Sequence, residues 1–287
     1  MTPGDPSRRC VRVSAMLMSL LFGLPGAWAA PAANDAPPQA SPLVIGQTFG
    51  VESSVLGETR RINVYRPSAW NLSPEQPLPV LYMPDGGMGE DFLHVAGLLQ
   101  VLTANGSMRP FLLVGIENTE RRRDMTGPTS VPEDRKIAPR VGGSAAFRRF
   151  LSEELIPQIG RRYPVTAERA IIGESLAGLF VVETLLQAPD MFDTYIALDP
   201  SLWWNNRGLI NEAAKPLTVL SARHRQVFLA SSGERRMAAD AQRLSGVLQA
   251  ADPGIGVTYR AWPDESHATI YHPAALDALR TLFKPAP

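Results

Sequence analysis

The serine best placed for chemistry is Ser175, within the segment GESLA at residues 173–177. An apolar run precedes it and a helical pattern over residues 179–186 follows, which is the strand–turn–helix context of a nucleophile elbow. Such a turn lifts the serine Oγ above the sheet and needs small residues two positions away on either side. Gly173 meets this need, and Ala177 departs from the usual second glycine. The pattern predicts a serine nucleophile, and an ordinary strand-to-helix turn is the alternative.

A serine nucleophile needs a base, because a free hydroxyl is barely ionised near neutral pH. The sequence has four histidines. His94 falls in an apolar helical segment, His224 in a polar turn, and His272 at the start of the last helical segment. His267 lies in a turn-rich loop after the last strand candidate, where an α/β hydrolase carries its histidine. We therefore expect His267 to be the base.

The acid of a serine triad is expected between the serine and the histidine in the chain. Glu234 is the first carboxylate after the strand candidate at residues 227–230. Its predicted role is to accept the Nδ1 proton of His267 and to stabilise the imidazolium. Asp240 is the rival candidate, and capping of the next helix is the alternative role for Glu234.

An oxyanion hole needs backbone N–H groups directed at the developing negative charge. The residue after the nucleophile, Leu176, is expected to supply one donor. The glycine-rich turn DGGM at residues 85–88, which follows a buried strand candidate, is expected to supply the other. Gly87 is the favoured donor in that turn, and Gly86 is the second choice.

The elements that must position these residues alternate between short apolar runs and helical patterns. Strands are predicted at residues 48–56, 59–65, 79–83, 111–116, 170–173, 194–198, 227–230 and 257–261. The first two flank Gly57-Glu58 and predict an antiparallel hairpin. Apolar positions from Phe147 to Ile159 predict one long helix. The alternation predicts an α/β fold, a mostly parallel sheet with helices on both faces and an N-terminal antiparallel hairpin.

Two segments could form the rim of a site at the carboxyl ends of the strands. The stretch from Ile116 to Ala145 is long, poor in apolar residues and locally basic. Loops of this length are usually functional or disordered, and a solvated insertion is the alternative. We expect Arg121 and Arg123 to meet anionic substrate groups. Trp203 and Trp204 are the candidate aromatic wall, and filling the core is their alternative role.

The N-terminus has the pattern of an export signal. A basic start, an apolar run and the sequence AWA at residues 27–29 predict a cleaved signal peptide over residues 1–29. An uncleaved anchor is the alternative, and the choice between general secretion and twin-arginine export stays open. Residues 30–42 predict a flexible lead, and residues 43–287 one catalytic domain. The only cysteine, Cys10, lies in the signal. The expected location is the periplasm or the exterior.

Composition restricts the partners. The 287 residues carry 28 basic and 28 acidic side chains, and no run of like charge suggests a nucleic-acid surface. No HExxH, no paired CxxC, and no GxGxxG after a strand is present, so the sequence implies neither a metal nor a cofactor. The expected partner is a small-molecule ester, with no membrane span after signal cleavage. The oligomeric state is not predicted.

Several motifs together resemble a known family. They are LPVLYMPDGG (78–87), GIENTERRRD (115–124), GESLAGLF (173–180), DPSLWWN (199–205) and ESH (265–267). Over residues 44–284 they resemble the esterase D and enterochelin (siderophore trilactone) esterase group of α/β hydrolases. The resemblance implies Ser175 as nucleophile, His267 as base, and donors at Gly87 and Leu176. Some of these esterases work with little help from an acid, which makes Glu234 the least secure match.

The sequence thus predicts a serine carboxylic-ester hydrolase that works through an acyl-enzyme. The resemblance implies siderophore-type aromatic esters or trilactones as substrates. The alternatives are an esterase for acetyl or feruloyl groups of polysaccharides, an acyltransferase to another alcohol, or a non-catalytic ligand-binding protein of the same fold.

Overall fold

The computed structural model describes residues 40–68, 72–213, 225–251 and 255–285. The predicted signal, most of the predicted lead and His224 lie outside the described residues. The chain divides into Met1–Leu43 and a larger compact unit, Val44–Pro287, to which the following description applies. No helix within the described ranges is long and apolar enough to cross a membrane.

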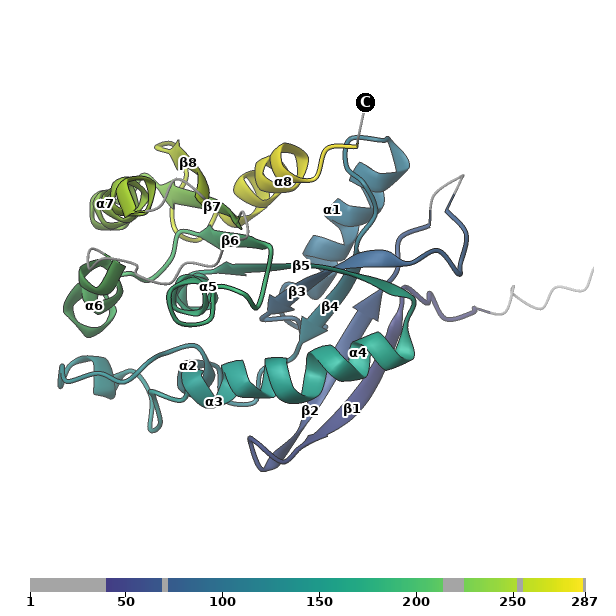
Figure 1. Ribbon diagram of the computed structural model, residues 1–287, viewed down its shortest axis with the longest axis horizontal. Helices are drawn as coiled ribbons and strands as arrows, with labels where there is room; N and C mark the ends of the chain where they lie inside the picture. The colour runs from purple at the N-terminus through teal and green to yellow at the C-terminus, as the bar shows by residue number, and fades with distance from the viewer. Residues whose placement is uncertain (1–39, 69–71, 214–224, 252–254, 286–287) are drawn as a thin grey trace, which may run out of the picture. The chain divides into compact units, whose positions relative to one another are not determined.

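The larger unit is built on an eight-stranded sheet with the order β1-β2-β4-β3-β5-β6-β7-β8 (Figure 1). β1 and β2 form an antiparallel hairpin, and β2 pairs antiparallel with β4. All remaining neighbours are parallel. The predicted mostly parallel sheet with an N-terminal antiparallel hairpin is confirmed. The strands are β1 (Gln47–Ser53), β2 (Glu58–Tyr65), β3 (Leu78–Pro84), β4 (Leu112–Ile116), β5 (Val165–Glu174), β6 (Thr194–Leu198), β7 (Arg225–Ser232) and β8 (Ile255–Trp262).

Helices cover both faces of this sheet. α1 and α8 pack together on one face, over an apolar cluster that includes Phe92 and Leu279. The larger cluster on the other face includes Phe147, Phe180 and Leu244, from α3, α5 and α7. The helices are α1 (Phe92–Ala104), α2 (Arg121–Asp124), α3 (Ser144–Arg149), α4 (Ile156–Arg162), α5 (Leu176–Gln187), α6 (Trp204–Ala213), α7 (Arg235–Ala251) and α8 (Tyr271–Leu282).

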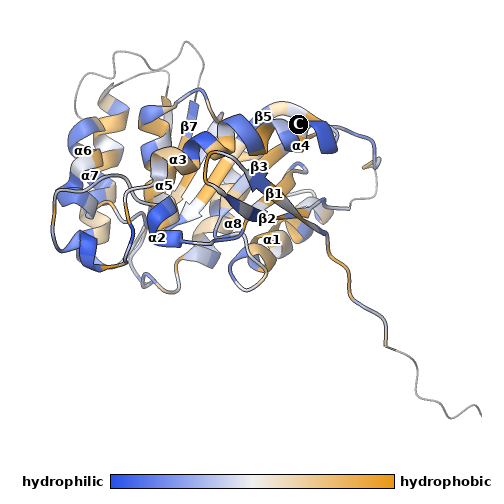
Figure 2. Cartoon of the chain, turned by 90° about the horizontal axis from the view of Figure 1, so that it is seen from below, coloured by the Kyte–Doolittle hydropathy of each residue, from blue (hydrophilic) through white to orange (hydrophobic). Residues whose placement is uncertain are grey.

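The strand sequences explain this layering. Every residue of β3, β4 and β6 is buried, as expected for parallel strands that helices cover on both sides. The exposed positions of β1 instead belong to an edge strand. Figure 2 shows the apolar residues concentrated in the central strands and the polar ones on outward-facing parts of the helices. Because β3, β5 and β6 pair in parallel, their carboxyl ends lie at a common edge of the sheet.

The predicted long helix is modified in its middle. Residues Phe150–Leu155 form a π-helical segment between α3 and α4. Pro157 lies at the start of α4 and has no N–H to donate to the preceding turn, so a regular α-helical ladder cannot run through this point. The apolar face is nevertheless retained, because Phe150, Leu151 and Leu155 are buried.

The long segment after β4 is ordered by contacts with the residues around α6. It contains α2 and a 3₁₀ turn at Asp134–Lys136. The indole Nε1–H of buried Trp204 donates to Gly127 O at 2.9 Å, and Asn205 N–H donates to Asp134 Oδ2 at 2.8 Å. Asn205, Asn206 and Arg207 all have positive φ, which is rare for non-glycine residues. The long segment after β4 is therefore packed against the first residues of α6.

Candidate active site

Ser175 occupies a sharp turn between β5 and α5. Its φ of 59° and ψ of −118° lie outside the ordinary regions for a side-chain-bearing residue. Backbone hydrogen bonds hold this conformation: Ser175 N–H donates to Leu198 O at 3.0 Å, and Ser175 O accepts from Ser201 N–H at 2.9 Å. The strained turn has the conformation expected of a nucleophile elbow.

The alanine in the elbow fits because Gly173 has no side chain. A Cβ added to Gly173 would lie 2.6 Å from the carbonyl carbon of Ala177 and 2.8 Å from the Ala177 Cβ. Gly178, one position later, has a similar role. A Cβ there would lie 3.1 Å from both Gly173 O and Pro200 Cα. The departure from the usual second glycine is thus accommodated in the turn.

His267 lies directly against the serine. Its Nε2 is 2.9 Å from Ser175 Oγ, and its Nδ1 is 2.7 Å from Asp199 Oδ2. With the proton on Nδ1, the imidazole donates to Asp199 and accepts the serine hydroxyl proton at Nε2. The structure therefore brings together a hydroxyl, an imidazole and a carboxylate in a continuous hydrogen-bonded series.

Asp199 follows the last residue of β6, and its side chain is fully buried. It adopts φ of 42°, and its N–H donates to Ala230 O at 2.9 Å. Oδ1 accepts the backbone N–H of Ser232 at 2.8 Å, so Oδ2 is oriented toward the imidazole. β6 adjoins β5 in the sheet, which puts Asp199 one strand away from the serine turn.

The prediction that Glu234 accepts the Nδ1 proton is wrong in this geometry, because Asp199 takes that position. Glu234 is exposed, and its Oε1 accepts the backbone N–H of His267 at 3.2 Å. Asp240, the rival candidate, is paired with Arg207 at 2.5 Å. Glu234 follows β7, two strands from the nucleophile, whereas Asp199 follows the adjacent strand. The order of residues along the chain does not show which strands are neighbours in the sheet, so it could not distinguish these two carboxylates.

The electrostatic environment favours the charged form of the imidazole. The hydrogen bond that His267 Nδ1–H donates to Asp199 raises the pKa of His267 above its ordinary value of 6.5, against the lowering effect of burial. The negative charge of Asp199, and that of Glu174 when Glu174 is ionised, add to the increase in this pKa. An imidazolium formed when the serine loses its proton is therefore stabilised at this position.

In the turn after β3, the N–H groups of both candidate oxyanion donors already have hydrogen-bond acceptors. Gly86 N–H donates to Ile116 O at 2.9 Å, so this second-choice donor is used within the sheet. Gly87 N–H donates to the Glu90 carboxylate at 2.7 Å. A developing oxyanion would have to displace Glu90, which is exposed, to use the Gly87 donor. Leu176 begins α5, and the first N–H groups of a helix have no partner within the helix.

Arg121 lies beside this turn and is held by it. Its Nε and Nη2 donate to the two carboxylate oxygens of Asp85 at 2.7 and 2.8 Å. Asp85 itself has φ of 59° and also accepts from Asn118 Nδ2. Two of the five N–H donors of the guanidinium thus maintain the turn. The expected contact between Arg121 and substrate stays a prediction.

Arg123 belongs to a different environment. Its guanidinium contacts carboxylates of Glu58, Glu120 and Asp124, with its shortest ion pair, to Asp124, at 2.7 Å. Arg60, which is completely buried, joins the same network through Glu58 and Asp124. The structure therefore places Arg123 in an ion-pair network that secures the β2 strand against α2. This position differs from the substrate rim expected from the sequence.

The two tryptophans have different exposures. Trp204 is 3% exposed and donates a hydrogen bond to Gly127 in the long loop. These are the contacts of a core residue, which is the alternative role that the sequence offered for it. Trp203 is partly exposed, and its ring contacts that of Trp204 at a centroid distance of 6.0 Å. Trp203 is the one of the pair that a substrate could contact.

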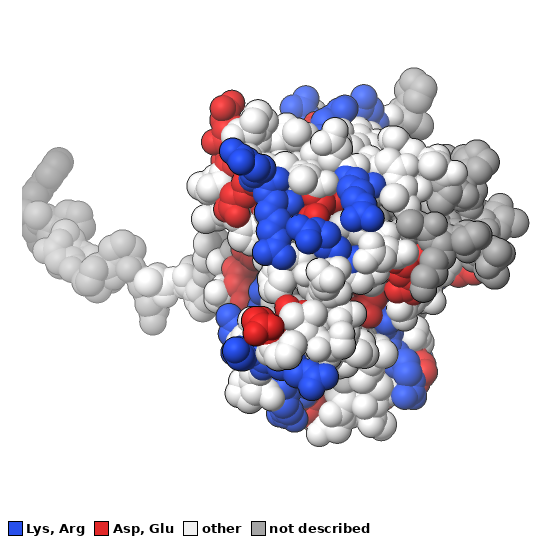
Figure 3. Space-filling model, turned by 90° about the vertical axis from the view of Figure 1, so that its left-hand side faces the viewer, with Lys and Arg blue, Asp and Glu red and all other residues white. Residues whose placement is uncertain are grey.

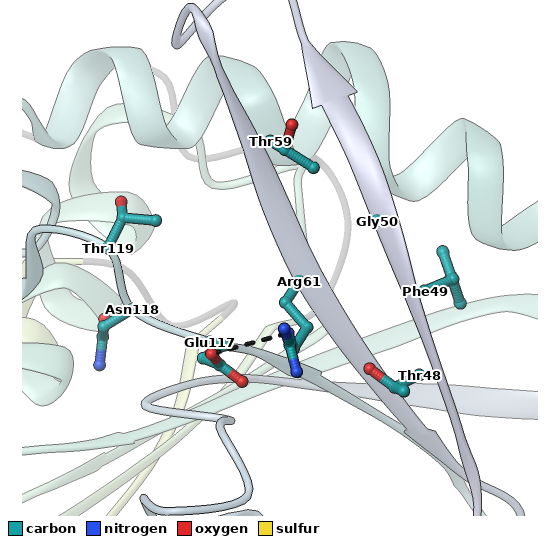
Figure 4. Close-up of a pocket in the computed structure, with 8 residues that line it drawn as sticks. All are labelled: Thr48, Phe49, Gly50, Thr59, Arg61, Glu117, Asn118 and Thr119. Carbon is teal, nitrogen blue, oxygen red and sulfur yellow. Dashed lines mark ion pairs between the residues drawn. The ribbon is translucent and has the colours of Figure 1, made fainter.

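Two of the hollows on the described surface lie near α2 and beside the β1–β2 hairpin. One, of about 610 Å³, is lined by Glu120–Arg123 and Ala138–Arg140. Figure 3 shows Lys and Arg side chains clustered on the face where α6 and α7 lie in Figure 1, with Asp and Glu directly beside them. The other, of about 540 Å³, lies against the β1–β2 hairpin, where Arg61 and Glu117 face each other (Figure 4). Neither hollow is lined by Ser175 or His267.

The arrangement is suited to acyl transfer through a covalent serine intermediate. In the part of the chain that the structure describes, no cluster of three or more His, Cys, Asp or Glu side chains could hold a metal ion. The site presents hydroxyl, imidazole, carboxyl and backbone N–H groups.

Comparisons with known proteins identify similar chains. Residues 53–243 match the model of the family described as "Putative esterase". The ferri-bacillibactin esterase BesA of Bacillus subtilis is 30% identical over 253 residues, which cover 79% of this chain and 86% of the relative. The crystal structure of an IroE-like serine hydrolase from Shewanella oneidensis is 27% identical, with a TM-score of 0.73, over 83% of this chain and 80% of that one.

A third similarity concerns the fold alone. The crystal structure of a BES protein from Bacillus cereus has a TM-score of 0.76 at 23% identity, over 86% of this chain and 99% of that one. The match to the family model spans both the serine turn and the strand that precedes Asp199. The chain therefore belongs to this esterase family, within the α/β hydrolases of the siderophore-esterase type, and is a carboxylic ester hydrolase.

Proposed function

We propose that the chain hydrolyses siderophore-type esters through an acyl-enzyme on Ser175. The observation that carries the proposal is the hydrogen-bonded series in which His267 links Ser175 Oγ to Asp199 at 2.9 and 2.7 Å. Ser175 attacks the ester carbonyl, and His267 Nε2 takes the hydroxyl proton. Asp199 holds the imidazole with its proton on Nδ1 and stabilises the imidazolium.

The proton then passes from Nε2 to the leaving alcohol, and the ester bond to that alcohol breaks. Water attacks the acyl-enzyme with His267 as base, which releases the acid and regenerates Ser175. The N–H of Leu176 and that of Gly87, once Glu90 has moved from it, would hold the tetrahedral oxyanion. Loss of one such donor typically costs about 3 to 4 kcal/mol in the transition state.

The substrate class comes from relatives and from one partly exposed aromatic residue. Similar proteins are described as esterases of bacillibactin, triacetylfusarinine C and salmochelin, all siderophores. The partly exposed Trp203 offers a ring on which a planar aromatic acyl group could stack. A trilactone or aromatic ester of a siderophore fits both considerations. We also propose export of the chain by the signal over residues 1–29.

A hydrolysis screen tests the proposal. Wild type, Ser175→Ala and the exposed-serine control Ser152→Ala are compared on nitrophenyl esters of graded chain length, a feruloyl ester and a ferric catecholate trilactone. We expect the trilactone to be the best substrate, with activity abolished by Ser175→Ala and retained by Ser152→Ala. Cleavage of simple esters without the trilactone would refute the substrate assignment. Activity retained in Ser175→Ala would refute the serine mechanism.

A further inference from the structure

The residue before the nucleophile is an acidic group that the proposed mechanism does not use. Glu174 is the last residue of β5, and its side chain is 16% exposed. Its Oε1 is buried and has no hydrogen-bond partner among the described residues. The same oxygen lies 3.4 Å from His267 Nε2, the atom that also contacts Ser175 Oγ. A buried carboxyl oxygen thus lies beside the nitrogen that exchanges the proton.

The surroundings of Glu174 determine its protonation. Burial raises the pKa of Glu174 to about 8, although His267 and Arg121 act to lower it. At neutral pH the group is therefore mostly a neutral carboxylic acid, with an O–H to donate. The charged and titratable groups facing it come from several elements: His267 from the loop before α8, Arg121 from α2, Asp199 after β6, Asp85 after β3 and Tyr271 from α8.

The geometry places this O–H close to where the leaving-group oxygen of the substrate must lie. To receive the proton from His267, the leaving-group oxygen must come within about 3 Å of Nε2. Glu174 Oε1 is 3.4 Å from the same nitrogen. An oxygen on the side of Nε2 that faces Glu174 would then be within hydrogen-bond reach of the carboxyl group. The unpartnered Oε1 is consistent with a partner that arrives with the substrate.

We propose that the Glu174 carboxyl group donates a hydrogen bond to the leaving-group oxygen of the ester during acylation. The Ser175 Oγ–carbonyl bond forms and the bond to the leaving oxygen breaks. The serine proton passes through His267 Nε2 to that oxygen, and Glu174 keeps its own proton. This inference rests on the proposed function, because it needs an acyl-enzyme on Ser175. It adds a residue that determines which alcohols can leave.

A leaving-group series tests the role. The kcat/KM for nitrophenyl acetate and for ethyl acetate reports acylation with the same acyl group. Nitrophenolate leaves without assistance, whereas ethoxide needs a proton or a hydrogen bond. We expect Glu174→Leu to lower kcat/KM about 100-fold for the ethyl ester and less than about threefold for the nitrophenyl ester. Glu174→Gln keeps an N–H donor and should restore most of the loss. The exposed glutamate control, Glu153→Gln, should match wild type.

The pH dependence provides a second readout. In wild type, kcat/KM for the ethyl ester should fall as the pH rises through about 8, where Glu174 loses its proton. Glu174→Gln should remove that alkaline decline. An equal loss on both esters, no loss on either, or an unchanged decline in Glu174→Gln would overturn the inference. Hydrolysis that persists in Ser175→Ala would instead overturn the proposed function, and this inference with it.

Discussion

Replacement of Asp199 by asparagine isolates the contribution of the buried carboxylate. The asparagine oxygen can still accept the Ser232 N–H, which Asp199 Oδ1 accepts at 2.8 Å. The amide nitrogen then faces His267 Nδ1 at the position of Oδ2, 2.7 Å away. Because an amide N–H donates, Nδ1 must accept, and the imidazole proton moves to Nε2. In that tautomer His267 cannot take the proton of Ser175.

The expected loss in kcat is about 10⁴-fold, which corresponds to about 5 kcal/mol in the activation free energy. Glu234→Gln is the matched control, because it alters only an exposed carboxylate that accepts one backbone N–H at 3.2 Å. That bond contributes about 1 kcal/mol or less, so turnover should change less than about fivefold. Steady-state kinetics on a nitrophenyl ester, with thermal unfolding to verify folding, gives both values. A large loss in Glu234→Gln with a mild one in Asp199→Asn would refute this assignment.

Three further predictions follow from particular contacts. The kcat/KM should fall with decreasing pH around a midpoint above 6.5, because the hydrogen bond from His267 to Asp199 raises the pKa of His267 and only the neutral imidazole acts as base; a midpoint at or below 6.5 in a pH profile would contradict this. Trp204→Phe should lower the free energy of unfolding by about 1–3 kcal/mol, because the buried Gly127 carbonyl loses its donor; an unchanged denaturation midpoint would count against this anchoring contact. Arg121→Ala should lower kcat on neutral and anionic esters alike, since the guanidinium supports the Asp85 turn; a salt-sensitive rise in KM confined to the anionic ester would show direct substrate contact instead.

Local patterns were sufficient to predict most of the scaffold. The continuous apolar runs predicted buried parallel strands, and the β6 prediction coincides with Thr194–Leu198. The π-helical segment at Phe150–Leu155 was missed because its apolar spacing also fits an α-helix. Pro157 is the residue from which an interruption of the helix could have been predicted.

The parts of the site that chain order and local motifs indicate could be predicted from the sequence. Chain order indicates Ser175 and His267 as the candidate nucleophile and base, and the structure places Ser175 Oγ 2.9 Å from His267 Nε2. Asp199 was missed because its proximity depends on sheet order: β6 adjoins β5, and β7 does not. The ion pairing of Arg123 with Glu58 joins residues 65 positions apart in the sequence, which composition cannot reveal.

Ser175 is the covalent nucleophile of the proposed mechanism. The most direct measurement is the intact mass of the protein after treatment with a fluorophosphonate ester, followed by peptide mapping of the adduct. We predict one adduct per chain, on the peptide that carries Ser175, with none in Ser175→Ala and much slower formation in His267→Ala. A stoichiometric adduct on another residue, or ester hydrolysis by Ser175→Ala at the wild-type rate, would contradict a nucleophilic role for Ser175.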